Sequence, residues 1–159
     1  ARLSMSLPHP DLYIDADACP VKDEVIRVAE RHQLTVHMVS NQYLRIAADH
    51  PLIHRVVVAE GMDAADHWIA EHITATDICV TTDIPLAARC LEKGARVLAP
   101  TGRVMTNDSI GNALAMRDLM SHLRDMGEMT GGPPSFTKQN RSQFLSALEN
   151  LIQAIKRGR

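Results

Sequence analysis

The sequence is poor in aromatic residues, and this scarcity excludes one large class of nucleic-acid-binding modules. Only five of its 159 residues are aromatic, and they are Tyr13, Tyr43, Trp68, Phe136 and Phe144. Domains that stack successive bases on aromatic platforms need several such side chains on one surface. The chain is therefore not expected to recognise nucleic acid by base stacking.

Cysteine pairs with metal-ligand spacing are also missing. The chain has three cysteines, and Cys19, Cys79 and Cys90 form no C-x-x-C pair. Of the eight histidines, His67 and His72 are five residues apart, and no H-E-x-x-H motif occurs. Neither a zinc site nor a disulfide framework is predicted.

No apolar run approaches the roughly twenty residues of a membrane-spanning helix. Residues 1–10 also lack the apolar centre of a signal peptide. We therefore expect a reduced, cytoplasmic protein without membrane association. Residues 1–10 are interpreted as a flexible leader and residues 11–159 as one domain, because a chain of this length with 45% hydrophobic residues buries one sizeable core.

Charge is distributed unevenly along the chain. The net charge of -2 excludes a uniformly basic nucleic-acid-binding surface. From residue 138 onward, however, Glu149 is the only acid against five basic residues, Lys138, Arg141, Lys156, Arg157 and Arg159. A solvated terminal helix is the favoured interpretation of this tail, and a patch that contacts nucleic acid is the alternative.

Short apolar runs alternate with amphipathic stretches, as in βαβ units around a mainly parallel sheet. Strands are expected at residues 12–15, 34–40, 55–59, 77–82 and 96–99. Helices are expected at residues 21–32, 43–50, 63–73, 84–93, 110–126 and 140–156. The predicted fold is α/β, with about five mainly parallel strands and C-terminal helices.

Acidic residues follow three of the predicted strands. Asp15 and Asp17 follow the first strand, and Asp83 follows the fourth. The pair Asp63 and Asp66 begins the helix after the third strand, and a spacing of three places both on one helix face. Because the carboxyl ends of parallel strands meet at one edge of a sheet, the five carboxylates are expected to converge there.

Converging carboxylates repel one another unless a cation neutralises them. Mg²⁺ or Mn²⁺ prefers oxygen ligands, and such ions activate water and stabilise the displacement at a phosphodiester. The five acids are therefore candidate metal ligands, and Asp15 and Asp83 are also candidate catalytic residues.

Each acid also has a purely structural interpretation. Asp63, with Asp66 three residues later, suits a helix N-cap, and Asp83 suits the cap of the next helix. Asp17 suits a turn that leads into Pro20. Taken together, acids at three strand ends favour a metal site over three independent caps.

Four further residues are assigned to the same edge. Lys22, in the first turn of a predicted helix, is a candidate catalytic cation, because a positive charge at that position opposes the helix dipole. Ser40, Asn41 and Thr82 are candidates for orienting substrate or water. A solvated lysine and an ordinary turn are the alternatives for Lys22 and Asn41. Cys19 is interpreted as a small buried side chain and not as a nucleophile.

Several segments together resemble a known family. They are Y-I-D-A-D-A-C-P-V-K at residues 13–22, S-N at 40–41, D-A-A-D at 63–66, T-T-D-I-P-L-A at 81–87 and G-G-P at 131–133. They resemble the uncharacterised bacterial YaiI/YqxD family, itself similar to the PIN/NYN-like nuclease superfamily. The resemblance implies a PIN-like three-layer α/β/α sandwich whose acidic pocket holds Mg²⁺ or Mn²⁺ and cleaves RNA. By position it assigns Asp15, Asp83, and Asp63 or Asp66 to that pocket.

Three functions remain open on the sequence. The leading hypothesis is a metal-dependent ribonuclease. The pattern of apolar residues before D-x-D also resembles haloacid-dehalogenase-type phosphatases, in which Asp15 would be the phosphorylated nucleophile and Asp17 the acid/base. The third hypothesis is a non-catalytic module that binds metal or nucleotide.

Overall fold

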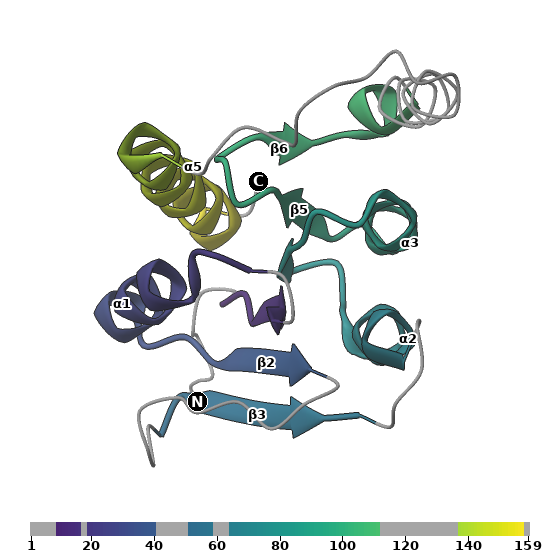
Figure 1. Cartoon of the computed structure of the whole chain (residues 1–159), viewed down its shortest axis with the longest axis horizontal. Helices are drawn as coiled ribbons and strands as arrows, with labels where there is room; N and C mark the ends of the chain where they lie inside the picture. Colours follow the sequence, from purple (N-terminus) through teal and green to yellow (C-terminus); the bar gives the residue numbers. More distant parts are fainter. Residues whose placement is uncertain (1–8, 17–18, 41–50, 59–63, 112–136, 158–159) are drawn as a thin grey trace, which may run out of the picture.

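A six-stranded sheet forms the centre of the protein in the computed structural model, which describes residues 9–16, 19–40, 51–58, 64–111 and 137–157. The strand order is β3-β2-β1-β4-β5-β6 (Figure 1). All neighbouring pairs from β3 to β5 are parallel, and β6 is antiparallel to β5. The strands are β1 (Leu12–Asp15), β2 (Val36–Ser40), β3 (Ile53–Val57), β4 (Ile78–Val80), β5 (Arg96–Leu98) and β6 (Val104–Met105).

Helices cover both faces of this sheet. Helices α1 (Lys22–His32) and α5 (Lys138–Lys156) lie on one face, and α2 (Ala64–His72) and α3 (Ile84–Glu92) lie on the other (Figure 1). A further helix begins at residue 107 and is described to residue 111. The predicted three-layer α/β/α sandwich is confirmed, and it is consistent with the PIN-like architecture that the resemblance implies.

Apolar side chains of the central strands alternate between the two faces of the sheet and contribute to two separate cores, one on each face. In β1, Leu12 and Ile14 pack into the core beneath α1 and α5, whereas Tyr13 packs into the core beneath α2 and α3. Successive side chains of a strand point to opposite faces, so a strand covered on both sides is apolar throughout. Asp15 follows Ile14 and therefore points toward the α2 and α3 side.

Several element boundaries differ from the sequence prediction. The third strand lies at residues 53–57 and not 55–59. The sheet has six strands, whereas about five were predicted, and the additional strand is the short β6. Helix α5 begins two residues before the predicted position 140, since Thr137 and Asn140 form a reciprocal capping box. The predicted helix at 43–50, most of the predicted helix at 110–126 and most of the leader lie outside the described residues. Among the described helices, none is long and apolar enough to cross a membrane.

The strand order creates a switch point between β1 and β4. From β1 the chain builds the sheet outward through β2 to β3, and it then crosses to β4 and builds in the other direction. In open α/β sheets, ligands bind at the carboxyl ends of the strands where the order reverses. The residues that follow β1 and β4 therefore occupy the position where a ligand site is expected.

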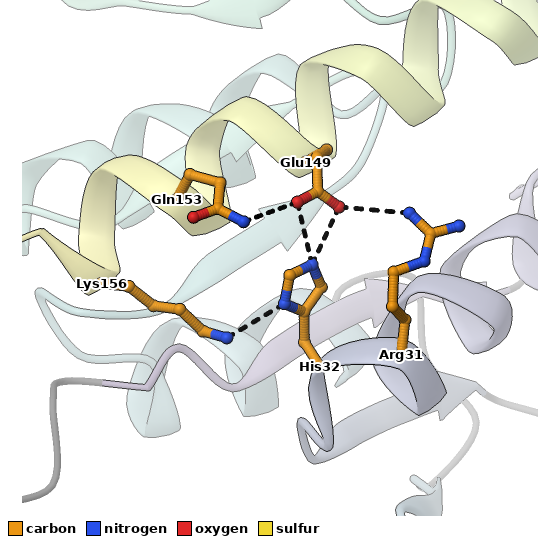
Figure 2. Close-up of polar contacts among 5 residues, drawn as sticks. All are labelled: Arg31, His32, Glu149, Gln153 and Lys156. Atoms are coloured by element: carbon orange, nitrogen blue, oxygen red, sulfur yellow. Dashed lines mark hydrogen bonds and ion pairs between the residues drawn. The ribbon is translucent and has the colours of Figure 1, made fainter.

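A polar cluster fastens α5 to α1 (Figure 2). The Nε2 atom of His32 lies 2.8 and 3.0 Å from the two carboxylate oxygens of Glu149, and its Nδ1 atom lies 3.0 Å from Lys156 Nζ. Because the ammonium of Lys156 can only donate, Nδ1 is the acceptor and Nε2 carries the hydrogen that it donates to Glu149. Gln153 and Arg31 also donate to this carboxylate.

The basic tail is thus partly used within the fold. Arg141 donates to Glu24, at 3.1 Å, and to the carbonyl of Pro20, at 2.9 Å. Four side chains of α5 are buried, Phe144, Leu148, Ile152 and Ile155. The helix is therefore an integral layer of the domain, as the prediction of one domain with C-terminal helices requires, with one face buried and basic residues such as Lys138 exposed on the other.

The Glu149 cluster predicts a pH-dependent contribution to stability. Hydrogen bonds from Gln153 and His32 lower the pKa of Glu149. A carboxyl group whose pKa is depressed by folding stabilises the protein above its unfolded pKa, about 4.3, and this contribution is lost as pH falls. Glu149→Gln should lower the free energy of unfolding by on the order of 1 kcal/mol at pH 7, and the difference from wild type should shrink as the pH falls below about 4 and through the lowered pKa of Glu149.

Chemical denaturation across this pH range measures the effect. Glu92→Gln, at an exposed position on α3, is the matched control and should stay close to wild type throughout. A Glu149→Gln difference that is independent of pH would contradict the assignment.

Candidate functional site

A buried threonine joins the carboxyl ends of β1 and β4. The hydroxyl of Thr81 donates to Oδ2 of Asp15 at 3.1 Å and accepts from the backbone N–H of Asp83 at 3.0 Å. Thr81 directly follows β4, and it is only 2% exposed. The register pairs Ile14 with Val80, so the next residues along both strands, Asp15 and Thr81, lie at the same level of the sheet. One side chain therefore fixes the position of a carboxylate on the neighbouring strand.

Asp83 lies at the same edge and serves as a helix cap. Its Oδ1 atom accepts from the backbone N–H of Leu86 at 3.0 Å, and Pro85 occupies the first turn of α3. Both features are typical of a helix N-terminus. The structural interpretation of Asp83 as an N-cap is confirmed. Capping occupies Oδ1 alone, and the carboxylate has a second oxygen, so a further role is compatible with the cap.

Asp66 reaches the same region from α2. It lies in the first turn of that helix, at the carboxyl edge of the sheet. The pKa of the buried Cys79 thiol is raised, first by its hydrogen bond with Cys90 and by burial, and then by the negative charges of Asp15 and Asp66. Asp15 points to the face of the sheet that α2 covers, so Asp15 and Asp66 lie on the same side of the sheet.

The remaining candidates are placed as follows. The Lys22 ammonium, in the first turn of α1, donates to the carbonyl of Cys19 at 3.0 Å. Ser40 is buried at the end of β2, next to β1, whereas Thr82 is exposed. Burial raises the pKa of Cys19 to about 11, which agrees with a small buried side chain and disfavours a thiolate nucleophile.

Three predicted residues, Asp17, Asn41 and Asp63, lie outside the described residues. Within the described part of the chain, no group of three or more His, Cys, Asp and Glu side chains is arranged to hold a metal ion.

An acid at the opposite edge of the sheet shows what a structural carboxylate looks like in this fold. Asp77 is buried and accepts from the backbone N–H groups of Asp11, at 2.9 Å, and Thr74, at 2.8 Å, and from the Thr74 hydroxyl. These bonds fix the loop that enters β4. Asp15 differs from this pattern, because its partner Thr81 comes from the end of the neighbouring strand at the switch point and not from an adjacent loop.

Sequence reasoning selected Thr82 as the orienting residue and missed Thr81. The available signal was the alternation of β4, because Cys79 and Thr81 lie two residues apart and share a face. Since Cys79 packs beneath α2 and α3, Thr81 points to the face that also carries Asp15. Its neighbour Thr82 is exposed at the same edge of the sheet.

The two adjacent threonines allow a matched test. Thr81→Val keeps the shape of the side chain but removes the donor to Asp15 and the acceptor of the Asp83 N–H, so it should lower the free energy of unfolding by about 1–3 kcal/mol. Thr82→Val, at the exposed position, should change it by less than about 0.5 kcal/mol. Urea denaturation measures both, and equal effects of the two substitutions would contradict the bridging role of Thr81.

The chain is similar to a family of bacterial proteins along nearly all of its length. The family model described as "Uncharacterized BCR, YaiI/YqxD family" matches residues 13–154. A UPF0178 protein of Rhodospirillum rubrum is 57% identical over 149 residues, which cover 94% of this chain and 99% of the relative. A UPF0178 protein of Parvibaculum lavamentivorans is 59% identical over 147 residues, which cover 92% of this chain and 96% of the relative. No solved structure matches the chain significantly. The protein belongs to the YaiI/YqxD family.

Proposed function

We propose that this protein is a metal-dependent nuclease that hydrolyses RNA phosphodiesters at the carboxyl edge of β1 and β4. The observation that carries the proposal is the placement of Asp15 by the Thr81 hydroxyl, with Asp66 on the same side of the sheet. A carboxylate that is fixed in orientation at a switch point is suited to hold a ligand there.

The donor set favours a hard divalent cation. Asp15, Asp66 and the second oxygen of Asp83 are carboxylate ligands, and Asp17 and Asp63 are the acids proposed to complete the site. Oxygen-only ligands suit Mg²⁺ or Mn²⁺ and do not suit zinc, which takes His and Cys in most protein sites. When bound, such an ion supplies a nucleophilic hydroxide and stabilises charge on the phosphate.

The chain's own residues orient the reacting groups in this proposal. Asp15 is the central ligand, because Thr81 fixes one of its oxygens. Ser40, Asn41 and Thr82 supply hydroxyl and amide groups for substrate or water at the same edge. Lys22, in the first turn of α1, supplies a positive charge for the substrate phosphate. The low content of aromatic residues is compatible with this chemistry, because the phosphodiester is recognised through its charge and not through its bases.

Asp15→Asn tests the proposal most directly, because the amide has nearly the same shape but lacks the negative charge. Wild-type protein with Mn²⁺ should cleave single-stranded RNA, and the substitution should reduce the rate at least a hundredfold, the upper end of effects seen when even an outer-shell partner of a metal is lost. Asp23→Asn, at an exposed position in the first turn of α1, is the matched control and should cleave like wild type.

Gel analysis of labelled RNA with Mn²⁺ or with EDTA gives the measurement. Cleavage that survives Asp15→Asn would reject the site, and cleavage that survives EDTA would reject the metal. If Mn²⁺ binds but no phosphodiester is hydrolysed, the alternative of a non-catalytic metal-binding module is correct.

A further inference from the structure

A groove runs between α5 and the turn that joins β5 to β6. It has a volume of about 630 Å³ and is lined by Thr101, Gly102, Arg103, Ser142, Gln143, Ser146, Ala147 and Asn150. The groove is shallow and open to solvent. The lining residues of α5 span Ser142 to Asn150, which is about 12 Å of helix.

Gly102 allows the turn between β5 and β6 to lie close to the backbone of α5. Its φ angle of +93° lies in the left-handed region, and a Cβ atom at this position would lie only 2.6 Å from the Gln143 carbonyl carbon and 2.8 Å from the Phe144 nitrogen. Only glycine allows the turn to approach the α5 backbone this closely. The groove is therefore a defined feature of the fold, since a glycine in this conformation sets the distance between its walls.

The groove is also connected to the candidate site through the backbone. The N–H of Thr81 donates to the carbonyl of Leu98, and the N–H of Ala99 donates to the carbonyl of Arg103. The turn thus lies one strand beyond Thr81 and two beyond Asp15, about 10 Å along the carboxyl edge at ordinary strand spacing. The groove and Asp15 thus lie along one edge of the sheet, with the groove on the α5 side and the Asp15 carboxylate on the side of α2 and α3.

The chemistry of the lining selects the kind of ligand. Among the eight lining residues there is no acid and no aromatic ring, Arg103 carries a positive charge, and the hydroxyls and amides of Ser142, Ser146, Gln143 and Asn150 are uncharged donors and acceptors. An apolar ligand would leave these polar groups without partners, and stacked bases would find no ring. A phosphate accepts from guanidinium, hydroxyl and amide groups, and a ribose 2′-hydroxyl pairs with hydroxyls and amides.

We propose that this groove binds the sugar-phosphate backbone of single-stranded RNA next to the cleavage site. The inference rests on the proposed function, because it assigns the groove to the substrate of that reaction. It further specifies the substrate class: the strand is recognised by its backbone, with little preference for base sequence and with preference for RNA over DNA.

Binding in EDTA separates this proposal from catalysis, because no divalent metal is then present to support cleavage. Fluorescence anisotropy of a labelled single-stranded RNA measures affinity for the full chain. Arg103→Gln should weaken binding about tenfold, since it removes a charged hydrogen bond to phosphate, and it should reduce the slope of log K against log salt by about 0.7. Arg27→Gln, at an exposed position on α1, is the matched control and should bind like wild type.

A second pair of variants tests the groove by blocking it. Ser146→Glu places a negative charge within the groove and should weaken RNA binding about tenfold, whereas Ser146→Gln, of similar size and uncharged, should have little effect. Both substitutions are at an exposed helix position, so circular dichroism should show an unchanged fold.

The outcomes separate the groove from the proposed function. Wild-type affinity in both Arg103→Gln and Ser146→Glu would overturn the groove, even if the wild-type protein cleaves RNA. Wild-type protein that fails to bind RNA would also overturn it. RNA binding that depends on the groove, without any cleavage in Mn²⁺, would support the groove and overturn the nuclease. Equal affinity for DNA of the same sequence would overturn the assignment of the ribose hydroxyl contacts.

Discussion

The hydroxyl of Thr81 makes two hydrogen bonds at the point where the two halves of the sheet meet, and the carboxyl edge depends on both. One bond holds the carboxylate of Asp15, at the end of β1, and the other holds the N–H of Asp83, at the start of α3. A buried hydroxyl, carboxylate or N–H without a partner is costly, so the three groups stabilise one another. Thr81 therefore links the orientation of Asp15 to the start of α3.

Charge in this protein is arranged by layer as well as by position in the sequence. Asp15, Asp66 and Asp83 lie at the end of β1 and at the starts of α2 and α3, whereas three basic residues of the tail, Lys138, Arg141 and Lys156, lie on α5, which covers the face opposite α2 and α3 (Figure 1). Part of that positive charge is paired with α1, through Arg141 with Glu24 and through the contacts of Lys156 and His32 around Glu149. Toward the carboxyl edge, α5 and the turn that carries Arg103 line a polar groove. An acidic edge next to a polar groove without acids is an arrangement that suits a metal ion and a phosphate chain together.

Most of the fold could be predicted from the sequence, because it depends on local patterns. Apolar runs such as that of β1 and the amphipathic pattern of α3 locate their elements within a few residues. The short β6 was missed, since two residues, Val104 and Met105, carry no periodicity. The strand order, and with it the switch point between β1 and β4, depends on how distant segments pair, and no local pattern specifies it.

The candidate site could likewise be predicted only in part, because its positions follow from local patterns and its contacts do not. The carboxyl-edge positions of Asp15, Asp66 and Asp83 follow from their places after strands, and the capping role of Asp83 follows from Pro85 two residues later. The partner of Asp15 could not be predicted, because Thr81 lies 66 residues away in the sequence. The groove at Gly102 depends on a contact between a turn and α5, which are also distant in the sequence.

The central claim is that Asp15 and Asp66 share a divalent cation at the switch point. Titration of Mn²⁺, followed by the electron paramagnetic resonance signal of the free ion, tests it in wild-type protein and in Asp66→Asn. The account predicts that wild-type protein binds Mn²⁺ and that the substitution weakens binding at least tenfold, while Asp23→Asn binds like wild type. Wild-type protein that leaves the Mn²⁺ signal unchanged, or Asp66→Asn that binds as tightly as wild type, would contradict it.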